Sequence, residues 1–324
     1  MEGVRKTCEK QGRGEKSMGL LSARDIINQA KESANRETSN PPILEMGHLD
    51  TLWLQVTGTV CNLACLHCFI SCGPKNHNHE IMTVEAVKGA IDRAAEEGVK
   101  EIYFTGGEPF LHDEITTLIE MALEVAPLSV LTNGILIDEE LASWLGERFR
   151  ESRYSLDIRV SLDGTTADEN DAIRGRGTFE KILTGIDRLV VAGVNPVITV
   201  TTCHAELAMA EGRGRFFELL GARGIHRPRL KFLAPFKIGR EERRNGGYED
   251  YEVLKEGDLD EKAKKALQCS SCRMVTSKGS YPCPILIEVE EARMGKNLDD
   301  ALKPIALDHS ACYTCFVEGV TCRT

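Results

Sequence analysis

Closely spaced cysteines are the residues of this chain with the clearest capacity for chemistry. Cys61, Cys65 and Cys68 lie in the segment Cys-Asn-Leu-Ala-Cys-Leu-His-Cys. A [4Fe–4S] cluster normally takes four cysteine ligands, so three thiolates leave one iron open to a ligand from outside the protein. Zinc usually takes Cys-x2-Cys pairs together with a fourth protein ligand. The spacing therefore favours an incompletely ligated iron–sulfur cluster over zinc or buried free thiols.

A second segment suited to ligand binding is Thr105-Gly106-Gly107-Glu108-Pro109. Glycines lack a β-carbon, which lets a ligand lie against the backbone, and the Glu108 carboxylate can hold an ammonium group. Two further segments combine turn residues with polar side chains, namely Leu131-Thr132-Asn133-Gly134 and Ser161-Leu162-Asp163-Gly164. Each of these segments would be an ordinary turn if it stood alone.

The elements that must position these segments follow a repeating pattern from Leu52 onward. Short apolar runs predict strands at residues 52–56, 101–104, 128–131, 156–161, 197–201 and 229–233. Amphipathic stretches between them predict helices at residues 83–97, 114–125, 139–149, 179–192 and 206–221. Such alternation is typical of an α/β fold with a parallel sheet. Ligand sites in such sheets lie at the C-terminal ends of the strands, where all the segments above fall.

Together, the Cys61/Cys65/Cys68 loop, Gly106-Gly107-Glu108-Pro109 and Ser161-Leu162-Asp163-Gly164 resemble the radical S-adenosylmethionine (SAM) superfamily over residues 50 to 235. The resemblance implies a partial (β/α)6 TIM-like barrel. It also implies a [4Fe–4S] cluster whose open iron binds the amino and carboxylate groups of SAM. Electron transfer then cleaves SAM to methionine and a 5′-deoxyadenosyl radical, which abstracts hydrogen from a substrate.

The resemblance also implies a set of SAM-binding residues. Gly106, Gly107, Glu108 and Pro109 would contact the methionine amino group. The Ser161 hydroxyl and the Asp163 carboxylate suit the ribose and methionine ends of SAM, and Thr132 and Asn133 line the same mouth. Arg174, expected in a loop before the helix at 179–192, would lie near the SAM carboxylate, with a solvated arginine as the alternative. His67 departs from the family, in which an aromatic residue is commoner.

A second group of cysteines lies near the C-terminus: Cys269, Cys272, Cys283, Cys312, Cys315 and Cys322. On spacing alone they suit iron–sulfur or zinc ligation almost equally. The stretch 272–283 resembles the auxiliary-cluster domains called SPASM and twitch, which favours an auxiliary [4Fe–4S] cluster. Cys269, Cys272 and Cys283 also resemble the three-cysteine arrangement of the molybdenum-cofactor cyclase family, whose open iron meets the substrate. We favour one auxiliary cluster, with two as the alternative.

Size and composition limit the other possibilities. The 324 residues (35.8 kDa) suit a large domain and a smaller one. We expect a polar N-terminal extension at 1–48 with a helix at 23–34, the barrel at 49–235 and the auxiliary-cluster domain at 236–324. The net charge of −10 argues against nucleic acid as a partner. No apolar run reaches the roughly 18 residues of a membrane span, and no signal peptide is evident, so we expect a cytoplasmic protein.

Several residues carry weaker hypotheses. Cys203 could donate hydrogen to a product radical, although a buried inert thiol is the simpler interpretation. Cys72 is interpreted as close to the cluster loop by chance, and Cys8 as an exposed thiol. His77 and His79 are expected to be solvated. The charged run at 237–244 is expected to be a solvated face, with contact to an acidic substrate as the alternative.

The sequence thus predicts a radical SAM enzyme of oxidoreductase type. Its substrate is predicted to be a peptide or protein, with the same chemistry on a small molecule as the alternative. The auxiliary cluster would accept an electron from the substrate radical or bind the substrate. A flavodoxin or ferredoxin is the expected electron donor. A zinc-stabilised scaffold or redox sensor without catalysis is the remote alternative, which leaves Gly106-Gly107-Glu108-Pro109 unexplained.

Overall fold

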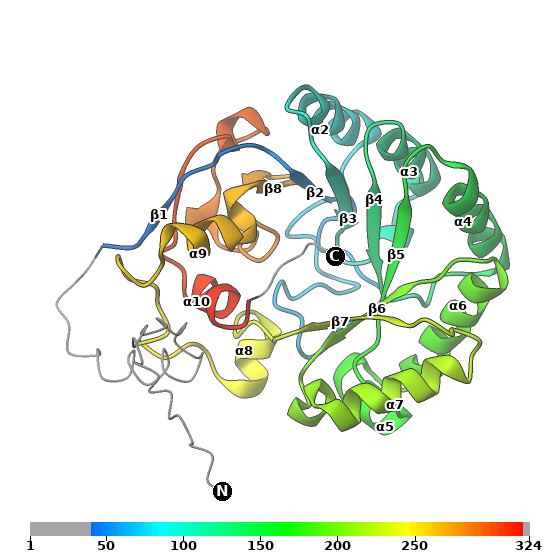
Figure 1. Cartoon of the computed structure of the whole chain (residues 1–324). Coiled ribbons are helices and arrows are strands. Elements are labelled where there is room, and N and C mark those ends of the chain that lie inside the picture. Colours follow the sequence, from blue (N-terminus) through cyan, green and yellow to red (C-terminus); the bar gives the residue numbers. More distant parts are fainter. Residues whose placement is uncertain (1–39, 320–324) are drawn as a thin grey trace, which may run out of the picture.

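An eight-stranded sheet forms the centre of the protein in the computed structural model, which describes residues 40–319 (Figure 1). Its strand order is β7-β6-β5-β4-β3-β2-β8-β9. The six strands from β7 to β2 each run parallel to their neighbours. They are β2 (Thr51–Gln55), β3 (Glu101–Thr105), β4 (Leu128–Thr132), β5 (Leu156–Ser161), β6 (Val197–Thr201) and β7 (Arg229–Leu233). The sheet curves as in a partial barrel, which confirms the predicted fold class.

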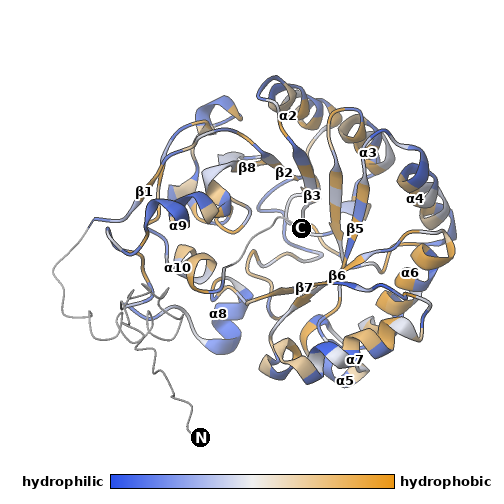
Figure 2. Ribbon diagram, in the orientation of Figure 1, coloured by the Kyte–Doolittle hydropathy of each residue, from blue (hydrophilic) through white to orange (hydrophobic). Residues whose placement is uncertain are grey.

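Helices follow the parallel strands and cover the outside of the sheet (Figure 1). They are α2 (Val84–Glu96), α3 (Ile115–Leu123), α4 (Glu139–Glu151), α5 (Ala167–Arg174), α6 (Thr178–Val191) and α7 (Ala210–Gly221). In α2, Val87, Ala90, Ile91 and Ala94 are buried, and this spacing places all four on one face of the helix. Figure 2 shows hydrophilic residues on the outer turns of α2 and α4.

The C-terminal segment extends the same sheet. Strand β8 (Cys272–Thr276) pairs in parallel with β2, and β9 (Gly279–Tyr281) pairs antiparallel with β8. The N-terminal strand β1 (Ile43–Leu44) pairs with β10 (Ile305–Ala306). The remaining helices are α8 (Arg240–Asn245), α9 (Glu261–Ala266) and α10 (Ser310–Val317), with short 3-10 turns η1 (Pro109–Leu111), η2 (Ala205–Ala208), η3 (Gln268–Ser270), η4 (Glu290–Ala292) and η5 (Asp299–Ala301).

Two large clusters of buried side chains hold these parts together. The first lies between the parallel strands and their helices and includes Leu52, Ile91 and Leu118. The second joins the parallel strands to the C-terminal segment, because Trp53 and Tyr103 share it with Met274 and Tyr281. The rings of Trp53 and Tyr103 stack with their centroids 4.2 Å apart. Strand β2 is therefore covered on both faces, as is usual for a central parallel strand.

The predicted elements agree closely with the structure. The strands predicted at 156–161, 197–201 and 229–233 coincide with β5, β6 and β7, and the other three lie within one residue of β2, β3 and β4. The helix predicted at 206–221 is wrong at its start, because the extended backbone of Met209 separates η2 from α7. The domain division at residue 235 stays a prediction. The helix expected at 23–34 lies outside the described residues.

Arg174 was expected in a loop, and this expectation is wrong. It is the last residue of α5, a helix that the sequence pattern did not predict. The Thr166 side chain caps this helix by accepting from the backbone N–H of Glu169. Among the described residues, no helix combines the length and apolar character needed to cross a membrane.

Candidate functional site

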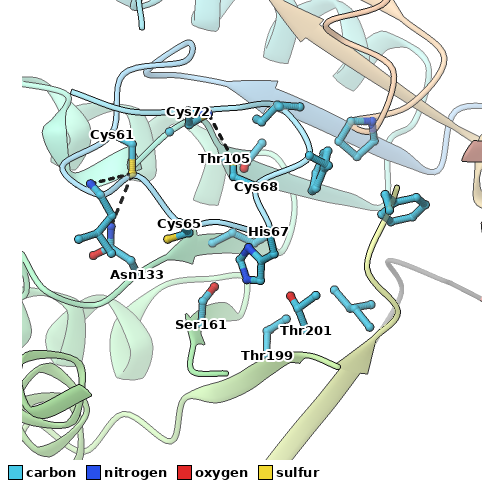
Figure 3. Close-up of a pocket in the computed structure, with 18 of the residues that line it drawn as sticks. Cys61, Cys65, His67, Cys68, Cys72, Thr105, Asn133, Ser161, Thr199 and Thr201 are labelled. Atoms are coloured by element: carbon cyan, nitrogen blue, oxygen red, sulfur yellow. Dashed lines mark hydrogen bonds between the residues drawn. The ribbon is translucent and has the colours of Figure 1, made fainter. Parts of the chain in front are cut away.

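A cavity of about 250 Å³ opens at the C-terminal ends of the parallel strands (Figure 3). Nine residues predicted to bind the cluster or SAM line it: Cys61, Cys65, Cys68, Gly106, Gly107, Thr132, Asn133, Ser161 and Arg174. These residues come from segments spread over more than one hundred positions of sequence, and the parallel sheet brings them together. Glu108, Pro109, Asp163 and Cys203 were predicted for the same site but do not line the cavity.

The cysteine loop follows β2 and holds its thiols with backbone N–H groups. The Leu63 N–H donates to Cys61 Sγ at 3.4 Å, and the Cys72 N–H donates to Cys68 Sγ at 3.3 Å. Hydrogen bonds to sulfur are among the means by which proteins tune iron–sulfur clusters. Within residues 40–319, no three His, Cys, Asp or Glu side chains converge as ligands of one metal ion would. Three separate thiols on an open cavity fit a cluster of several irons.

The thiols lie in an environment of low polarity beside two arginines. Burial raises the pKa of Cys61 to about 12. Burial also raises the pKa of Cys65, while the positive charges of Arg174 and Arg240 lower it. Ligation of iron requires thiolates, so the two guanidinium groups favour the ligating form.

Arg240, at the start of α8, donates several hydrogen bonds to the cysteine loop. Its Nε donates to Cys65 O at 2.8 Å, and its two terminal nitrogens donate to Ser71 O, at 3.2 Å, and to Cys72 O. Its backbone N–H donates to Cys68 O at 3.1 Å. The preceding Gly239 has a φ of +63°, and a β-carbon there would lie 2.2 Å from Phe69 O. Glycine is therefore required for α8 to approach the loop.

The run 237–244 was expected to be a solvated face, and for several of its residues this is wrong. Besides Arg240, Lys237 Nζ donates to both carboxylate oxygens of Glu252, at 2.7 and 2.8 Å. Glu241 is buried and accepts from Arg244. Alternating charge signs within a short run predicted exposure, whereas the structure pairs most of these charges with partners.

The second of the two glycines after β3 is required by packing within the protein. A β-carbon on Gly107 would lie 1.9 Å from Val60 O, so the residue is small because the turn packs against the cysteine loop. Glu108 N also donates to Val60 O, at 3.0 Å. Close packing against the cysteine loop therefore accounts for glycine at this position, and Gly106 and Gly107 both line the cavity as well.

Glu108 is fully buried and joins this turn to the end of β4. Its carboxylate accepts from Thr132 Oγ1 at 2.7 Å, from the Asn133 N–H at 2.7 Å and from the Phe110 N–H at 3.2 Å. Burial raises the pKa of Glu108 to about 7, although these hydrogen bonds lower it. The side chain thus fixes Thr132 and Asn133, which do line the cavity.

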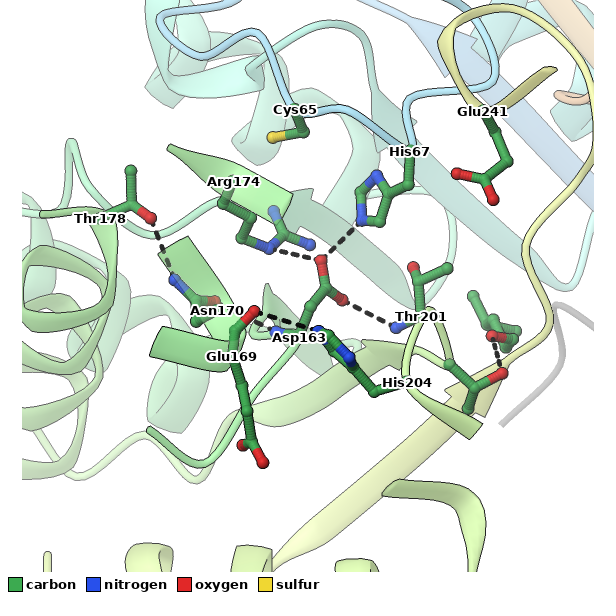
Figure 4. A network of polar contacts seen from close by, with 12 residues as sticks. Cys65, His67, Asp163, Glu169, Asn170, Arg174, Thr178, Thr201, His204 and Glu241 are labelled. Carbon is green, nitrogen blue, oxygen red and sulfur yellow. Dashed lines mark hydrogen bonds and ion pairs between the residues drawn. The ribbon is translucent and has the colours of Figure 1, made fainter. Parts of the chain in front are cut away.

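Asp163 is the centre of a second buried network (Figure 4). Its Oδ2 lies 2.6 Å from His67 Nε2 and forms an ion pair with Arg174 Nε at 2.8 Å, while Oδ1 accepts from the Thr201 N–H at 2.8 Å. Asp163 has no exposed surface, and Arg174 and His67 hold its pKa well below the usual range against the effect of burial. This carboxylate joins the cysteine loop to β5, α5 and β6.

Several other residues near the site were misjudged or missed. His67 received no role from the sequence, yet it ties the cysteine loop to Asp163. Cys72 is buried and lines the cavity with the three predicted ligands. His79 was expected to be solvated and is instead 1% exposed, with Nε2 3.0 Å from Ile287 O. Cys203 is half-buried, and burial raises its pKa to about 12.

The C-terminal cysteines form a second group. Cys269, Cys283, Cys312 and Cys315 line a cavity of about 40 Å³. Cys272 is fully buried at the start of β8 with its thiol 3.5 Å from Pro282 O, and it does not line this cavity. Cys322, like Cys8, lies outside the described residues.

A buried arginine braces this group as Arg240 braces the first. Arg273 has no exposed surface, and its Nη1 donates to Cys269 O at 2.8 Å and to Cys272 O at 2.5 Å. Its Nε donates to Ala301 O at 2.6 Å and its Nη2 to Lys303 O at 2.8 Å. Each cysteine group is therefore shaped by a guanidinium that bonds to backbone carbonyls of the cysteines or their neighbours.

Comparison with known proteins identifies the domain that contains the first group. Residues 56–207 match the family model for the radical SAM superfamily. The chain contains a radical SAM domain. Such a domain uses a [4Fe–4S] cluster and SAM, and the three thiols with Gly106, Asn133 and Ser161 on one cavity fit these cofactors.

Curated relatives of this radical SAM domain carry several names. Mycofactocin maturase MftC of Mycobacterium tuberculosis is 34% identical over 134 residues, which are 41% of this chain and 32% of that protein. AdoMet-dependent heme synthase of Oleidesulfovibrio alaskensis is 34% identical over 168 residues, which are 51% of this chain and 42% of that protein. The chain thus matches less than half the length of either relative.

Solved structures share the fold over a larger part of the chain. Native anSMEcpe with bound AdoMet is 18% identical with a TM-score of 0.58, and the match covers 82% of each chain. The same protein with bound AdoMet and the Cp18Cys peptide is 19% identical with a TM-score of 0.55, over 78% of this chain and 79% of that one. These structures therefore share the overall fold of this chain.

Proposed function

We propose that this chain is a radical SAM enzyme that abstracts hydrogen from a peptide or protein substrate, for a net oxidative modification or bond formation. The observation that carries the proposal is that Cys61, Cys65 and Cys68 line one cavity together with Asn133 and Ser161. The chemistry supplied when the cluster and SAM are bound is reductive cleavage of SAM to methionine and a 5′-deoxyadenosyl radical, which takes hydrogen from the substrate.

The chain's own residues would bind and orient SAM. Cys61, Cys65 and Cys68 would ligate the cluster as thiolates and leave one iron open to SAM. The guanidinium of Arg174, fixed by Asp163, would face the SAM carboxylate. Glu108 would act by holding the Asn133 backbone, with Pro109 beginning the turn that follows. This differs from direct contact with the SAM ammonium group, because the Glu108 carboxylate does not line the cavity.

Apolar side chains would keep water and stray hydrogen donors away from the reacting carbon. Trp53, Leu131, Phe236 and Ile285 all line the cavity. Exclusion of water is a main contribution of a protein to cofactor radical chemistry. The ring of Phe236, from the segment after β7, also packs edge-on against Phe69 of the cysteine loop, with the centroids 5.7 Å apart.

We further propose one auxiliary [4Fe–4S] cluster in the C-terminal segment. Four of the candidate ligands, Cys269, Cys283, Cys312 and Cys315, line a common cavity, and four thiolates ligate such a cluster fully. In this proposal Cys272 is a buried thiol beside the cluster and not a ligand. A cluster there could take an electron from the substrate radical, which would make the net reaction an oxidation.

The sequence identity of 34% to the mycofactocin maturase supports a peptide or protein substrate. The sequence identity of 34% to the AdoMet-dependent heme synthase supports the alternative, which is the same chemistry on a small molecule. A flavodoxin or ferredoxin is the proposed electron donor in both cases.

Separate cysteine variants test the two cluster assignments. After anaerobic reconstitution and reduction with dithionite, the wild-type chain should convert SAM to 5′-deoxyadenosine. Cys61→Ala should abolish this conversion because the cluster loses a ligand. Cys283→Ala should retain it while product formation with substrate is lost. Equal retention of SAM cleavage in both variants would contradict the assignment.

Iron content tests the number of auxiliary clusters. With Cys61, Cys65 and Cys68 all changed to alanine, about four irons per chain should remain if one auxiliary [4Fe–4S] cluster is present. About eight irons would mean two clusters. Zinc in place of iron would remove the proposed redox role of the C-terminal segment.

A further inference from the structure

The cavity is lined by several basic residues, of which Arg159 and Lys231 have no role in the proposed binding of the cluster or SAM. Among the described residues that line it, the charged side chains of arginine and lysine are Arg159, Arg174, Lys231 and Arg240, and no aspartate or glutamate lines it. Arg174 is paired with Asp163, and Arg240 donates to loop carbonyls. Arg159 and Lys231 line the same cavity from β5 and β7. A basic cavity does not follow from composition, since the whole chain has a net charge of −10.

Strand order places Arg159 and Lys231 on the two strands that flank β6, which carries Thr199. Lys231 on β7 pairs with Thr199 on β6, and Thr199 pairs with Ser161 on β5. Arg159 precedes Ser161 by two residues, so both side chains point to the same face of the sheet. Thr199 Oγ1 is buried and has no hydrogen-bond partner among the described residues. Figure 3 shows Ser161, Thr199 and Thr201 side by side along the cavity.

Arg159 is held rigidly in its position. Its guanidinium lies over the Tyr103 ring, with 4.8 Å from its central carbon to the ring centroid. Its Nη2 donates to the Tyr103 hydroxyl at 3.0 Å, and that hydroxyl in turn donates to Glu101 Oε2 at 2.9 Å. A planar guanidinium has five N–H donors and suits two-point binding of carboxylate or phosphate. Preorganisation of this kind lowers the entropic cost of binding an anion.

We propose that the substrate of this enzyme carries a carboxylate or phosphate group, and that Arg159, Lys231 and the Thr199 hydroxyl bind it. The inference rests on the proposed function and names the substrate chemistry of the same cavity. The apolar residues Trp53, Leu131 and Phe236 would cover the rest of the substrate. The carboxylate of SAM is a different anion, because it belongs at the open iron beside the cysteine loop, where Arg174 lies.

Three matched probes test this proposal on the reconstituted enzyme with SAM present. The probes are 3-phenylpropanoate, benzyl phosphate and the neutral 3-phenylpropanamide, which share an aromatic ring and a short linker. Calorimetric titration should show binding of one or both anions at least tenfold tighter than binding of the amide. Preference for the carboxylate or for the phosphate identifies which group the substrate carries.

Variants then assign the binding to the proposed residues. Lys231→Met should weaken anion binding at least tenfold and leave the dissociation constant of SAM unchanged, and Lys262→Met serves as an exposed control. Arg159→Lys should also weaken anion binding, and circular dichroism checks that this variant folds. Equal binding of all three probes, or no binding of either anion, would overturn the proposal.

The SAM dissociation constant separates this proposal from the proposed function. If Lys231→Met or Arg159→Lys weakened SAM binding tenfold without affecting the probes, the two residues would serve SAM and the substrate inference would be wrong. If the wild-type chain bound the anions selectively but did not cleave SAM, the proposed function would fail while the anion site stood.

Discussion

Glu108, like Asp163, is an acidic residue that is fully buried at the site. It is a carboxyl group with no exposed surface, placed between two loops that line the cavity. Burial raises its pKa from an ordinary value of 4.5 to about 7. The folded protein therefore keeps this proton at pH values where the unfolded chain has already lost it.

This shift gives the stability of the apoprotein a predictable pH dependence. Between pH 4.5 and about 7 the folded state binds more protons than the unfolded state, so the contribution of Glu108 to stability falls as pH rises. The difference in free energy of unfolding between wild type and Glu108→Gln should change by about 3 kcal/mol across this range. Urea unfolding at several pH values measures it, with exposed Glu124→Gln as control. Parallel curves would contradict the prediction.

Cys61, Cys65, Cys68 and Gly106-Gly107 could be singled out from sequence because their spacing is local and chemically restrictive, and the structure places them all on one cavity. The contacts of His67, Asp163 and Arg174 could not be predicted, because they join residues up to 96 positions apart in sequence. Glu108 was also singled out from sequence, but only the fold reveals that its carboxylate accepts from the Asn133 N–H and does not line the cavity.

At the scale of elements, the segment from Phe236 to α8 supports the cysteine loop. Arg240 reaches the carbonyls of Cys65, Ser71 and Cys72, and Gly239 allows the close approach. Each hydrogen bond to a charged group contributes roughly 1.5–3 kcal/mol. The loop carries the proposed cluster ligands, so its rigidity should govern how firmly iron is held.

Arg240→Gln should therefore accelerate loss of iron from the radical SAM cluster. We expect at least a tenfold faster release to a chelator under anaerobic conditions, measured by absorbance in a background with Cys269, Cys283, Cys312 and Cys315 changed to alanine. Arg243→Gln, an exposed arginine on the same helix, should release iron at the wild-type rate. Equal rates for all three proteins would show that the loop keeps its shape without Arg240.

Elements of the parallel sheet were predicted well because each has a clear apolar period. Helix α5 was missed because its eight residues, Ala-Asp-Glu-Asn-Asp-Ala-Ile-Arg, are mostly polar and give no apolar face. The pairing of β8 with β2 was also beyond the sequence, since more than two hundred residues separate the two strands. The sequence of a short strand in a cysteine-rich segment does not indicate which other strand it pairs with.

At the scale of the whole molecule, the C-terminal segment completes the barrel core. Strand β8 covers the edge of β2, and Met274 and Tyr281 join Trp53 and Tyr103 in one buried cluster. The predicted division at residue 235 therefore marks a change in amino-acid composition, but one cluster of buried side chains contains residues from both sides of it. Removal of the second part would expose the edge of a central parallel strand, which is a liability for aggregation.

A fragment ending at residue 235 should consequently fail to behave as an independent domain. We expect it to aggregate or to unfold at a urea concentration well below that of the full chain, and to retain no cluster after reconstitution, because it lacks both β8 and Arg240. In the full chain, the fluorescence of Trp53 in a Trp144→Phe background and far-ultraviolet circular dichroism should report one shared transition. A soluble fragment that binds about four irons and SAM would instead establish the barrel as autonomous, and the shared core would then add stability without being required for folding.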